Sequence, residues 1–258
     1  MLSISNNYQN NFIKNDNSKK SSYPSFRSNY TVTEDIFNPS VKQTKNATCF
    51  FRCDLDWNKF CKIILKNHEP NEKLNIVCVP CSDGSEPTSL LLKLMQFKDF
   101  RNNVSNFDCI KAYDIDEKQL EIAKSGKIPL LNNGMFLSDI LALALNAGKD
   151  LGKTYNLKDG CLELADNLKD KIKYEKKDIV EVVRNLPKDE KVVLLARNIF
   201  PYIDNYFQVP KMFEALSQLK SGSILAIGDY DKKLPNFEDE ILKLGYKKSS
   251  TENCFIKI

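Results

Sequence analysis

The sequence is poor in histidine, in long apolar runs and in net charge. Its only histidine among 258 residues is His68, which argues against a histidine-based metal site. No apolar run approaches the roughly 20 residues of a membrane-spanning helix, and residues 1–7 lack the basic start and apolar stretch of a cleaved signal peptide. The 38 basic and 34 acidic residues are interspersed and give a net charge of +4, without a clustered basic patch. We therefore expect a cytoplasmic protein with no membrane insertion and no nucleic-acid partner.

Eight cysteines lie mostly inside apolar segments of a chain large enough to fold without disulfides, so we expect reduced thiols. Cys78 and Cys81 form a Cys-x-x-Cys pair, a spacing found in redox motifs and in half of a zinc site. However, Cys78 belongs to a predicted strand and no second cysteine pair has ligand spacing. We predict no metal.

The composition divides the chain into two parts. Residues 1–45 are rich in Asn, Ser, Lys and Tyr and have no sustained periodicity, so we interpret them as a polar arm that is partly disordered or draped over the core. The remaining residues, 46–258, contain the apolar periodic segments of one domain.

A strand, a turn and a helix follow one another between residues 74 and 97. Ile76, Val77 and Val79 predict a buried strand, residues 80–85 supply turn chemistry, and Glu86-Pro87 suits a first helical turn. In an open α/β sheet, such a turn is where the charged end of a cofactor approaches backbone N–H groups.

A second strand is predicted over residues 106–116, and it ends in Asp114-Ile115-Asp116. Strand, helix and strand imply a parallel βαβ unit, in which an acid after the second strand usually holds the ribose of a nucleotide-type cofactor. We assign Asp114 to the ribose and expect Asp116 to cap the next helix.

The rest of the domain continues this alternation. Strands are predicted over 172–178, 192–196 and 224–228, an edge strand over 254–258, and helices over 54–65, 138–147, 206–219 and 238–244. The predicted fold is α/β, a doubly wound and mostly parallel sheet with helices on both faces and an antiparallel last strand. Ahead of the first helix, Phe50 and Phe51 are adjacent and are not expected to face the same core.

Several separated segments together resemble the S-adenosylmethionine-dependent methyltransferases of the chemotaxis-receptor glutamate O-methyltransferase (CheR) type. The family's Thr-x-Phe-Phe-Arg, its Cys-Ser-x-Gly-x-Glu-Pro-x-Ser loop, its acidic strand end and its Arg-Asn-x-x-x-Tyr recur here in order. The matching residues are Thr48, Phe50, Phe51, Arg52, Cys81, Ser82, Gly84, Glu86, Pro87, Ser89, Asp114, Ile115, Asp116, Arg197, Asn198 and Tyr202.

The resemblance implies a Rossmann-like class I methyltransferase fold, S-adenosylmethionine as cofactor and S-adenosylhomocysteine as product. It further implies a cofactor site in which Glu86 faces the ammonium, Asp114 the ribose and Asn198 the sulfonium. The full cofactor-binding set would be Cys81, Ser82, Gly84, Glu86, Asp114, Ile115, Asp178, Ile179, Arg197 and Asn198. Thr48, Arg52 and Tyr202 would line the methyl-transfer pocket as catalytic residues.

The sequence departs from the family at several points. A short polar arm replaces the family's helical domain, and the small β-subdomain that many members use to dock on receptors has no obvious room between Gly228 and the last strand. Thr88 stands where the family usually has Tyr, and Asp178 where it has Asn.

The expected reaction is methyl transfer to a carboxylate oxygen, with a glutamate side chain of a protein as the main hypothesis. A carboxylate is already ionised near pH 7 and needs no strong base, which agrees with a chain whose only histidine is His68. The alternatives are a methyltransferase for a small molecule or another protein side chain, and an inactive cofactor-binding sensor or scaffold. A nicotinamide-dependent oxidoreductase is disfavoured because only Gly84 lies between Pro80 and Pro87.

Overall fold

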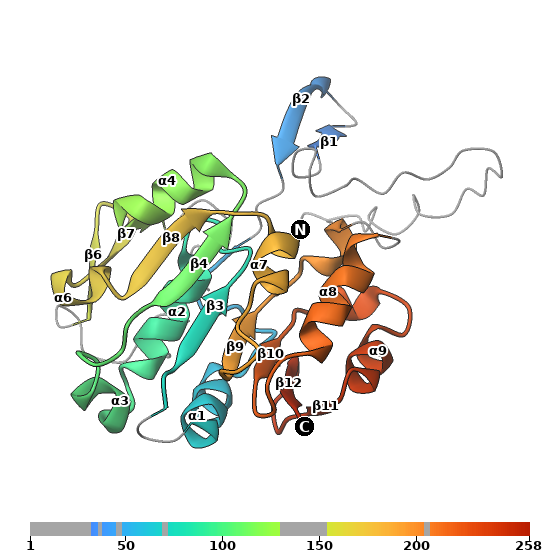
Figure 1. Ribbon diagram of the computed structural model, residues 1–258. Coiled ribbons are helices and arrows are strands. Elements are labelled where there is room, and N and C mark those ends of the chain that lie inside the picture. Colours follow the sequence, from blue (N-terminus) through green and yellow to red (C-terminus); the bar gives the residue numbers. More distant parts are fainter. Residues whose placement is uncertain (1–31, 36–37, 45–47, 69–71, 130–153, 204–206) are drawn as a thin grey trace, which may run out of the picture.

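A seven-stranded sheet forms the centre of the computed structural model, which describes residues 32–35, 38–44, 48–68, 72–129, 154–203 and 207–258 (Figure 1). The strand order is β11-β12-β10-β9-β3-β4-β8. The strands span, in this order, Tyr246–Lys248, Cys254–Lys257, Ile224–Ala226, Val192–Leu195, Asn75–Cys78, Ile110–Asp114 and Ile172–Lys176. Neighbours from β10 to β8 are parallel, and β12 runs antiparallel to β10 and β11. The predicted doubly wound, mostly parallel α/β fold is confirmed.

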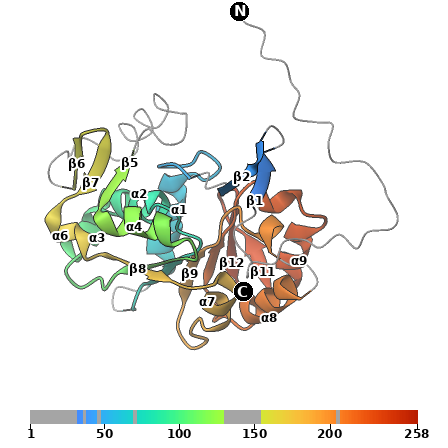
Figure 2. The same ribbon diagram turned by 90° about the horizontal axis from the view of Figure 1, so that it is seen from above.

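Helices cover both faces of this sheet (Figure 2). One face carries α1 (Trp57–Asn67), α2 (Ser85–Leu94), α3 (Lys98–Asn102), α4 (Glu117–Ser125) and α6 (Asp166–Lys169). The other face carries α7 (Ile179–Arg184), α8 (Gln208–Ser217) and α9 (Phe237–Lys243). Each set of helices encloses its own apolar cluster against the sheet, and β3, β9 and β10 are buried on both faces.

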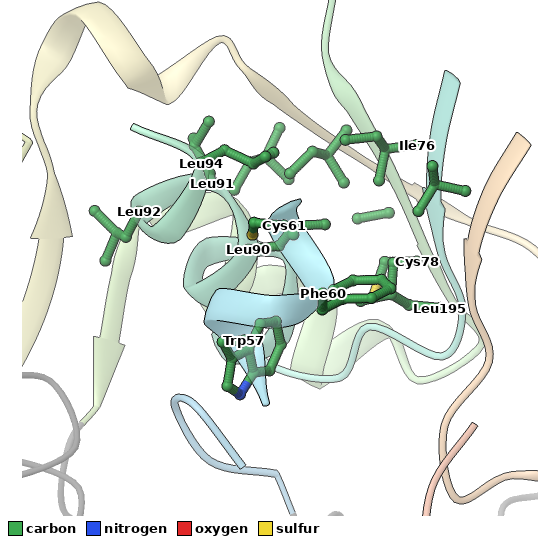
Figure 3. Packing of buried hydrophobic residues seen from close by; sticks show 14 of the residues in the cluster. Trp57, Phe60, Cys61, Ile76, Cys78, Leu90, Leu91, Leu92, Leu94 and Leu195 are labelled. Carbon is green, nitrogen blue, oxygen red and sulfur yellow. The ribbon is translucent and has the colours of Figure 1, made fainter. Parts of the chain in front are cut away.

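Helix α1 shows how the sequence sets the packing. It begins after Asp56, whose side chain accepts a hydrogen bond from the N–H of Lys59 at 3.0 Å. Trp57, Phe60 and Ile64 recur at helical spacing and are buried, and Phe60 lies beside α2 in the cluster drawn in Figure 3. Burial of such side chains contributes about 2 kcal/mol each.

The expectation that Phe50 and Phe51 face different environments was wrong. Both are buried in the same apolar cluster, with exposed fractions of 2% and 4%. The reason is local backbone geometry: Phe51 has φ of 46°, so the chain turns there instead of alternating as a strand would. The ring of Phe51 packs edge-on against Trp57, with 5.7 Å between centroids.

Two features of the sheets were not predicted. Strand β11 lies at the edge, so β12, expected there, is flanked by β10 and β11. A separate three-stranded antiparallel sheet of order β5-β7-β6 lies in sequence between α4 and β8. It is formed by Lys127–Pro129, Cys161–Leu164 and Tyr155–Lys158. A small β-subdomain is therefore present, but it lies before β8 and not between Gly228 and the last strand, the interval considered in the sequence.

Within the arm, β1 (Val32–Asp35) and β2 (Asn38–Thr44) pair antiparallel. The predicted boundary near residue 45 stays a prediction. The predicted helix over 138–147 lies outside the described residues, as does the start of the one predicted over 206–219. Two short 3₁₀ helices, η1 (Phe200–Tyr202) and η2 (Asp231–Lys233), follow β9 and β10.

All eight cysteines are free thiols. Burial raises the pKa of the Cys78 and Cys81 thiols well above the ordinary value, which suppresses the reactive thiolate. In the part of the chain that the structure describes, no cluster of potential metal ligands occurs. No helix among those residues has the length and apolar character to cross a lipid bilayer.

Candidate active site

The turn between β3 and α2 is shaped by Gly84, which has φ of +88° and precedes the helix. A Cβ atom there would lie 2.7 Å from the hydroxyl oxygen of Tyr174 on β8, so the position needs glycine for both backbone and space. In the same turn, the N–H of Cys81 donates to the Tyr113 carbonyl at 2.8 Å, and the N–H of Ser82 donates to Asp114 Oδ2 at 2.7 Å. The turn is thereby fixed against the end of β4.

Asp114 lies at the carboxyl end of β4 with an exposed fraction of 2%. Besides Ser82, its carboxylate accepts a hydrogen bond from the N–H of Asp116 at 2.9 Å. Carboxylate oxygens have several acceptor positions, so both contacts leave capacity for hydroxyl donors such as those of a ribose. Asp116 caps α4 as predicted, accepting from the N–H groups of Lys118 and Gln119 at 3.0 and 3.3 Å.

Arg197, directly after β9, lies in the centre of a buried ion cluster. Its side chain has no exposed surface, pairs with Glu86 at 2.9 Å, and also pairs with Asp54. The guanidinium lies 5.3 Å from the centroid of the Trp57 ring. Glu86, which was expected to face the ammonium group of the cofactor, therefore pairs with Arg197. A carboxylate has several acceptor positions, so Glu86 can also accept a hydrogen bond from a cationic ligand.

Arg52 belongs to the same electrostatic environment. Burial lowers the pKa of its guanidinium, but the carboxylates of Glu86 and Asp54 raise it, and the net effect is a pKa above the ordinary value. Arg52 is thus a permanent cation. The structure brings this residue, predicted to be catalytic, next to residues predicted to hold the cofactor.

Asn198 has φ of 56° and a closely enclosed side chain. Its Oδ1 accepts from the N–H of Tyr230 at 2.9 Å, and its Nδ2 lies 3.4 Å from Asp54 Oδ2. A Cβ atom at Gly228 would overlap the Asn198 amide, so glycine is required there. The amide is positioned by protein groups on three sides.

Asp231 connects the loops that follow β9 and β10. Its side chain is fully buried, and it accepts from the N–H groups of Asn198, Phe200 and Gly228 at 2.7, 3.0 and 2.8 Å. Burial raises the pKa of Asp231 to about 6, and these backbone hydrogen bonds oppose the rise. Asp231 therefore fixes the backbone that carries Asn198.

Tyr202 lies in η1 and is 38% exposed. Burial raises the pKa of its phenol, and so do Tyr230 and Asp231, while Arg52 lowers it. The phenol therefore stays protonated at neutral pH and can donate a hydrogen bond. Thr48 is half-buried ahead of the Phe50-Phe51 anchor.

Asp178 and Ile179 behave differently from each other. Asp178 caps α7 by accepting from the N–H groups of Val180 and Glu181 at 2.8 and 3.4 Å. Ile179 is fully buried in the apolar cluster under α7, and Ile115 packs against that cluster. Their assignment to the adenine edge stays a prediction.

Ser82 Oγ, Asp178 Oδ2 and Arg197 Nε are among the buried polar atoms that have no hydrogen-bond partner in the described residues, and they lie at this edge of the sheet with Thr88 Oγ1 and Asn253 Oδ1. Buried polar groups are nearly always satisfied, so these atoms indicate a polar ligand. A hydroxyl, a carboxylate oxygen and a guanidinium N–H complement the hydroxyl, amino and carboxylate groups of S-adenosylmethionine. The site residues fit this cofactor.

Sequence reasoning missed three residues of this network: Asp54, Asp231 and Asn253. Asn253 Nδ2 donates to the Asp54 carbonyl at 2.6 Å and to Asp229 Oδ1 at 2.9 Å. Asp54 is the first residue of the helix predicted over 54–65, and Asp231 follows the strand predicted over 224–228 by three residues. The position of Asp231 after a buried strand was a usable signal, whereas the contacts of Asp54 and Asn253 depend on tertiary structure.

This fold, with a cofactor-compatible site at the carboxyl edge of its parallel strands, defines a class I methyltransferase domain. The family model "CheR methyltransferase, SAM binding domain" matches residues 46–248. The chain belongs to this family, which confirms the resemblance and identifies S-adenosylmethionine as the cofactor.

Two curated relatives are distant. "Chemotaxis protein methyltransferase 2" of Vibrio cholerae serotype O1 is 25% identical over 189 residues, covering 72% of this chain and 62% of the relative. "Chemotaxis protein methyltransferase" of Vibrio anguillarum is 22% identical over 188 residues, covering 72% of this chain and 64% of the relative. The chain thus spans less than two thirds of the length of these relatives.

Solved structures resemble the chain more weakly. Magnesium protoporphyrin IX methyltransferase from Synechocystis PCC 6803 has a TM-score of 0.39 at 10% identity, with 78% of each chain covered. An S-adenosylmethionine-dependent O-methyltransferase from Thermotoga maritima has a TM-score of 0.37 at 15% identity, covering 79% of this chain and 64% of that one.

Proposed function

We propose that this chain transfers the methyl group of S-adenosylmethionine to a carboxylate oxygen of a protein, as a glutamate O-methyltransferase. The observation that supports this most is the buried ion pair of Glu86 and Arg197, with the half-buried Arg52 beside it, at the carboxyl edge of the sheet of a CheR-family domain. Arg52, proposed to bind the acceptor, interacts electrostatically with Glu86, proposed to bind the cofactor.

The proposed roles follow from the chemistry of each side chain. The cofactor, when bound, would supply a methyl group on a sulfonium. The acceptor oxygen would bond to the methyl carbon in line as the S–C bond breaks, and the neutral thioether S-adenosylhomocysteine would leave with that electron pair. Asp114 would hold the ribose and Glu86 the ammonium, while Arg52 would orient the acceptor carboxylate through paired hydrogen bonds. Tyr202, whose raised pKa keeps it protonated, would donate to the carboxylate oxygen that does not react.

The reaction requires no general base, because the acceptor is ionised at neutral pH. The position of His68 agrees with this. Its Nδ1 lies 3.0 Å from the Ile64 carbonyl at the end of α1, next to Asn67, which donates to the Gly222 carbonyl ahead of β10. These contacts lie at the amino edge of the sheet, opposite the proposed site.

A protein acceptor is supported by the three-stranded sheet β5-β7-β6, since the resemblance implies that family members use a small β-subdomain for docking. The distant chemotaxis methyltransferases point the same way. The eight free thiols support a location in the reducing cytoplasm.

The test is transfer of a tritiated methyl group from S-adenosylmethionine into a lysate of the source cell, followed by gel separation. A labelled protein band that is absent with Asp114→Asn supports the proposal. Label only in small molecules would favour the small-molecule alternative. Binding of cofactor with no labelled product of any kind would favour a sensor or scaffold.

A further inference from the structure

The Asp54 carboxylate contacts three groups of the candidate site. One carboxylate oxygen pairs with Arg197, and the other lies 3.4 Å from Asn198 Nδ2 and 3.3 Å from the backbone nitrogen of Asp229. Its side chain is only 7% exposed. It therefore contacts Arg197 and Asn198 in the loop after β9, as well as the loop that follows β10.

The backbone of Asp54 is held as firmly as its side chain. Its carbonyl accepts from Asn253 Nδ2 at 2.6 Å, and the same amide donates to Asp229 Oδ1 at 2.9 Å. Asn253 has φ of 59°, in the turn just before β12. Asp54 thereby joins four separate parts of the chain at one point: its own segment, the two loops and this turn.

We propose that Asp54 is a positioning residue of the cofactor site, which orients Arg197 and Asn198 and supplies a negative charge that favours the cationic cofactor over its neutral-sulfur product. This inference rests on the proposed function, because it assumes the same cofactor.

The charge of Asp54 matters for a cationic cofactor because it helps to balance two nearby arginines. Within the set of four side chains, Arg52 and Arg197 are balanced by Asp54 and Glu86, while Asp83 adds negative charge near Arg52 and Asp229 adds it near Arg197. Without the charge of Asp54, Arg197 would be paired with Glu86 alone, and the set would carry one excess positive charge. That charge would act against a sulfonium, and Glu86 would be less available to an ammonium.

The two cofactor forms provide a direct readout. S-adenosylmethionine and S-adenosylhomocysteine share their amino-acid and adenosine parts, but only the first carries the sulfonium charge. A substitution that only disorders the site would lower the affinity for both compounds equally. Removal of a negative charge should lower the affinity for S-adenosylmethionine more than the affinity for S-adenosylhomocysteine.

The experiment is calorimetric titration of the full chain with S-adenosylmethionine and with S-adenosylhomocysteine, comparing wild type, Asp54→Asn, Asp54→Ser and Asp54→Glu. The matched control is Asp56→Asn, the same chemical change at an exposed helix cap two residues away. Thermal unfolding of each variant is recorded alongside.

In the neutral Asp54 variants, we expect affinity for S-adenosylmethionine to fall on the order of threefold more than affinity for S-adenosylhomocysteine. Asp54→Glu should restore the wild-type ratio, and Asp56→Asn should leave it unchanged. An unchanged ratio in folded neutral variants overturns the inference. Failure of both neutral variants to fold also overturns it, because Asp54 would then be a structural residue. If the wild-type protein binds neither compound, the cofactor on which the proposed function depends is refuted. If it binds both but transfers no methyl group, only the proposed reaction is refuted.

Discussion

Gly228→Ala tests the enclosure of Asn198 that fixes the candidate site. A Cβ atom at this position would overlap the Asn198 amide, which cannot move freely because the N–H of Tyr230 holds its oxygen at 2.9 Å. Overpacking costs about 1–3 kcal/mol, and loss of the Tyr230 hydrogen bond adds about 1 kcal/mol. We therefore expect the free energy of unfolding to fall by about 2–4 kcal/mol.

A double-mutant cycle shows whether Asn198 is the cause. Asn198→Ala alone should cost about 1–2 kcal/mol, because the buried N–H of Tyr230 loses its partner. With Asn198 truncated, Gly228→Ala has nothing to overlap, so the double variant should also lose only about 1–2 kcal/mol. The coupling between the two positions should therefore be about 2–4 kcal/mol and favourable in sign.

Urea unfolding can be followed by the fluorescence of Trp57, the only tryptophan of the chain, which is 3% exposed. Gly126→Ala is the matched control, because a Cβ atom there meets nothing within 4 Å although its φ is +68°. It should cost about 1 kcal/mol of backbone strain. Additive effects of Gly228→Ala and Asn198→Ala would refute the reasoning.

Three further predictions concern stability, pH and binding. Phe51→Ala should cost about 3–5 kcal/mol in urea unfolding, because the buried ring leaves a cavity beside Trp57; a loss below about 1 kcal/mol would contradict the shared apolar cluster. Burial raises the pKa of Asp231 from its ordinary value to about 6, so the folded state binds more protons than the unfolded state, and stability should decrease as pH rises between these two pKa values. Asp231→Asn should remove this pH dependence, which amounts to about 2–3 kcal/mol of unfolding free energy over the whole interval. If the free energy of unfolding of Asp231→Asn changes with pH as that of the wild type does, Asp231 is not the group responsible. Asp114→Asn should weaken calorimetric binding of S-adenosylhomocysteine at least about tenfold, and unaltered binding would exclude the ribose assignment.

Most helices and strands of the central domain could be predicted from local sequence patterns. The apolar run at 192–196 and the β-branched run around Ile76 predicted buried strands, and β9 and β3 are found there. Asp116 was identified as a helix cap because capping depends on a few neighbouring residues. The edge strand β11 was missed because three residues with two exposed lysines carry little apolar signal.

The remaining errors have a tertiary origin. The two phenylalanines at 50 and 51 enter one core only because the backbone adopts a left-handed conformation at Phe51, which no local pattern required. The small sheet between α4 and β8 is formed by strands of three or four residues, too short for periodicity to detect. Motifs brought attention to Glu86 and Arg197, but their mutual ion pair, and the part of Asp54 in it, required the fold.

The most direct test of the central claim is the alkali stability of the methyl group that the chain transfers from tritiated S-adenosylmethionine to a lysate protein. A carboxylate acceptor gives a methyl ester, so the account predicts that mild base releases the label as volatile methanol. Label that resists base would show transfer to nitrogen or to an ether oxygen, and would contradict a carboxylate oriented by Arg52.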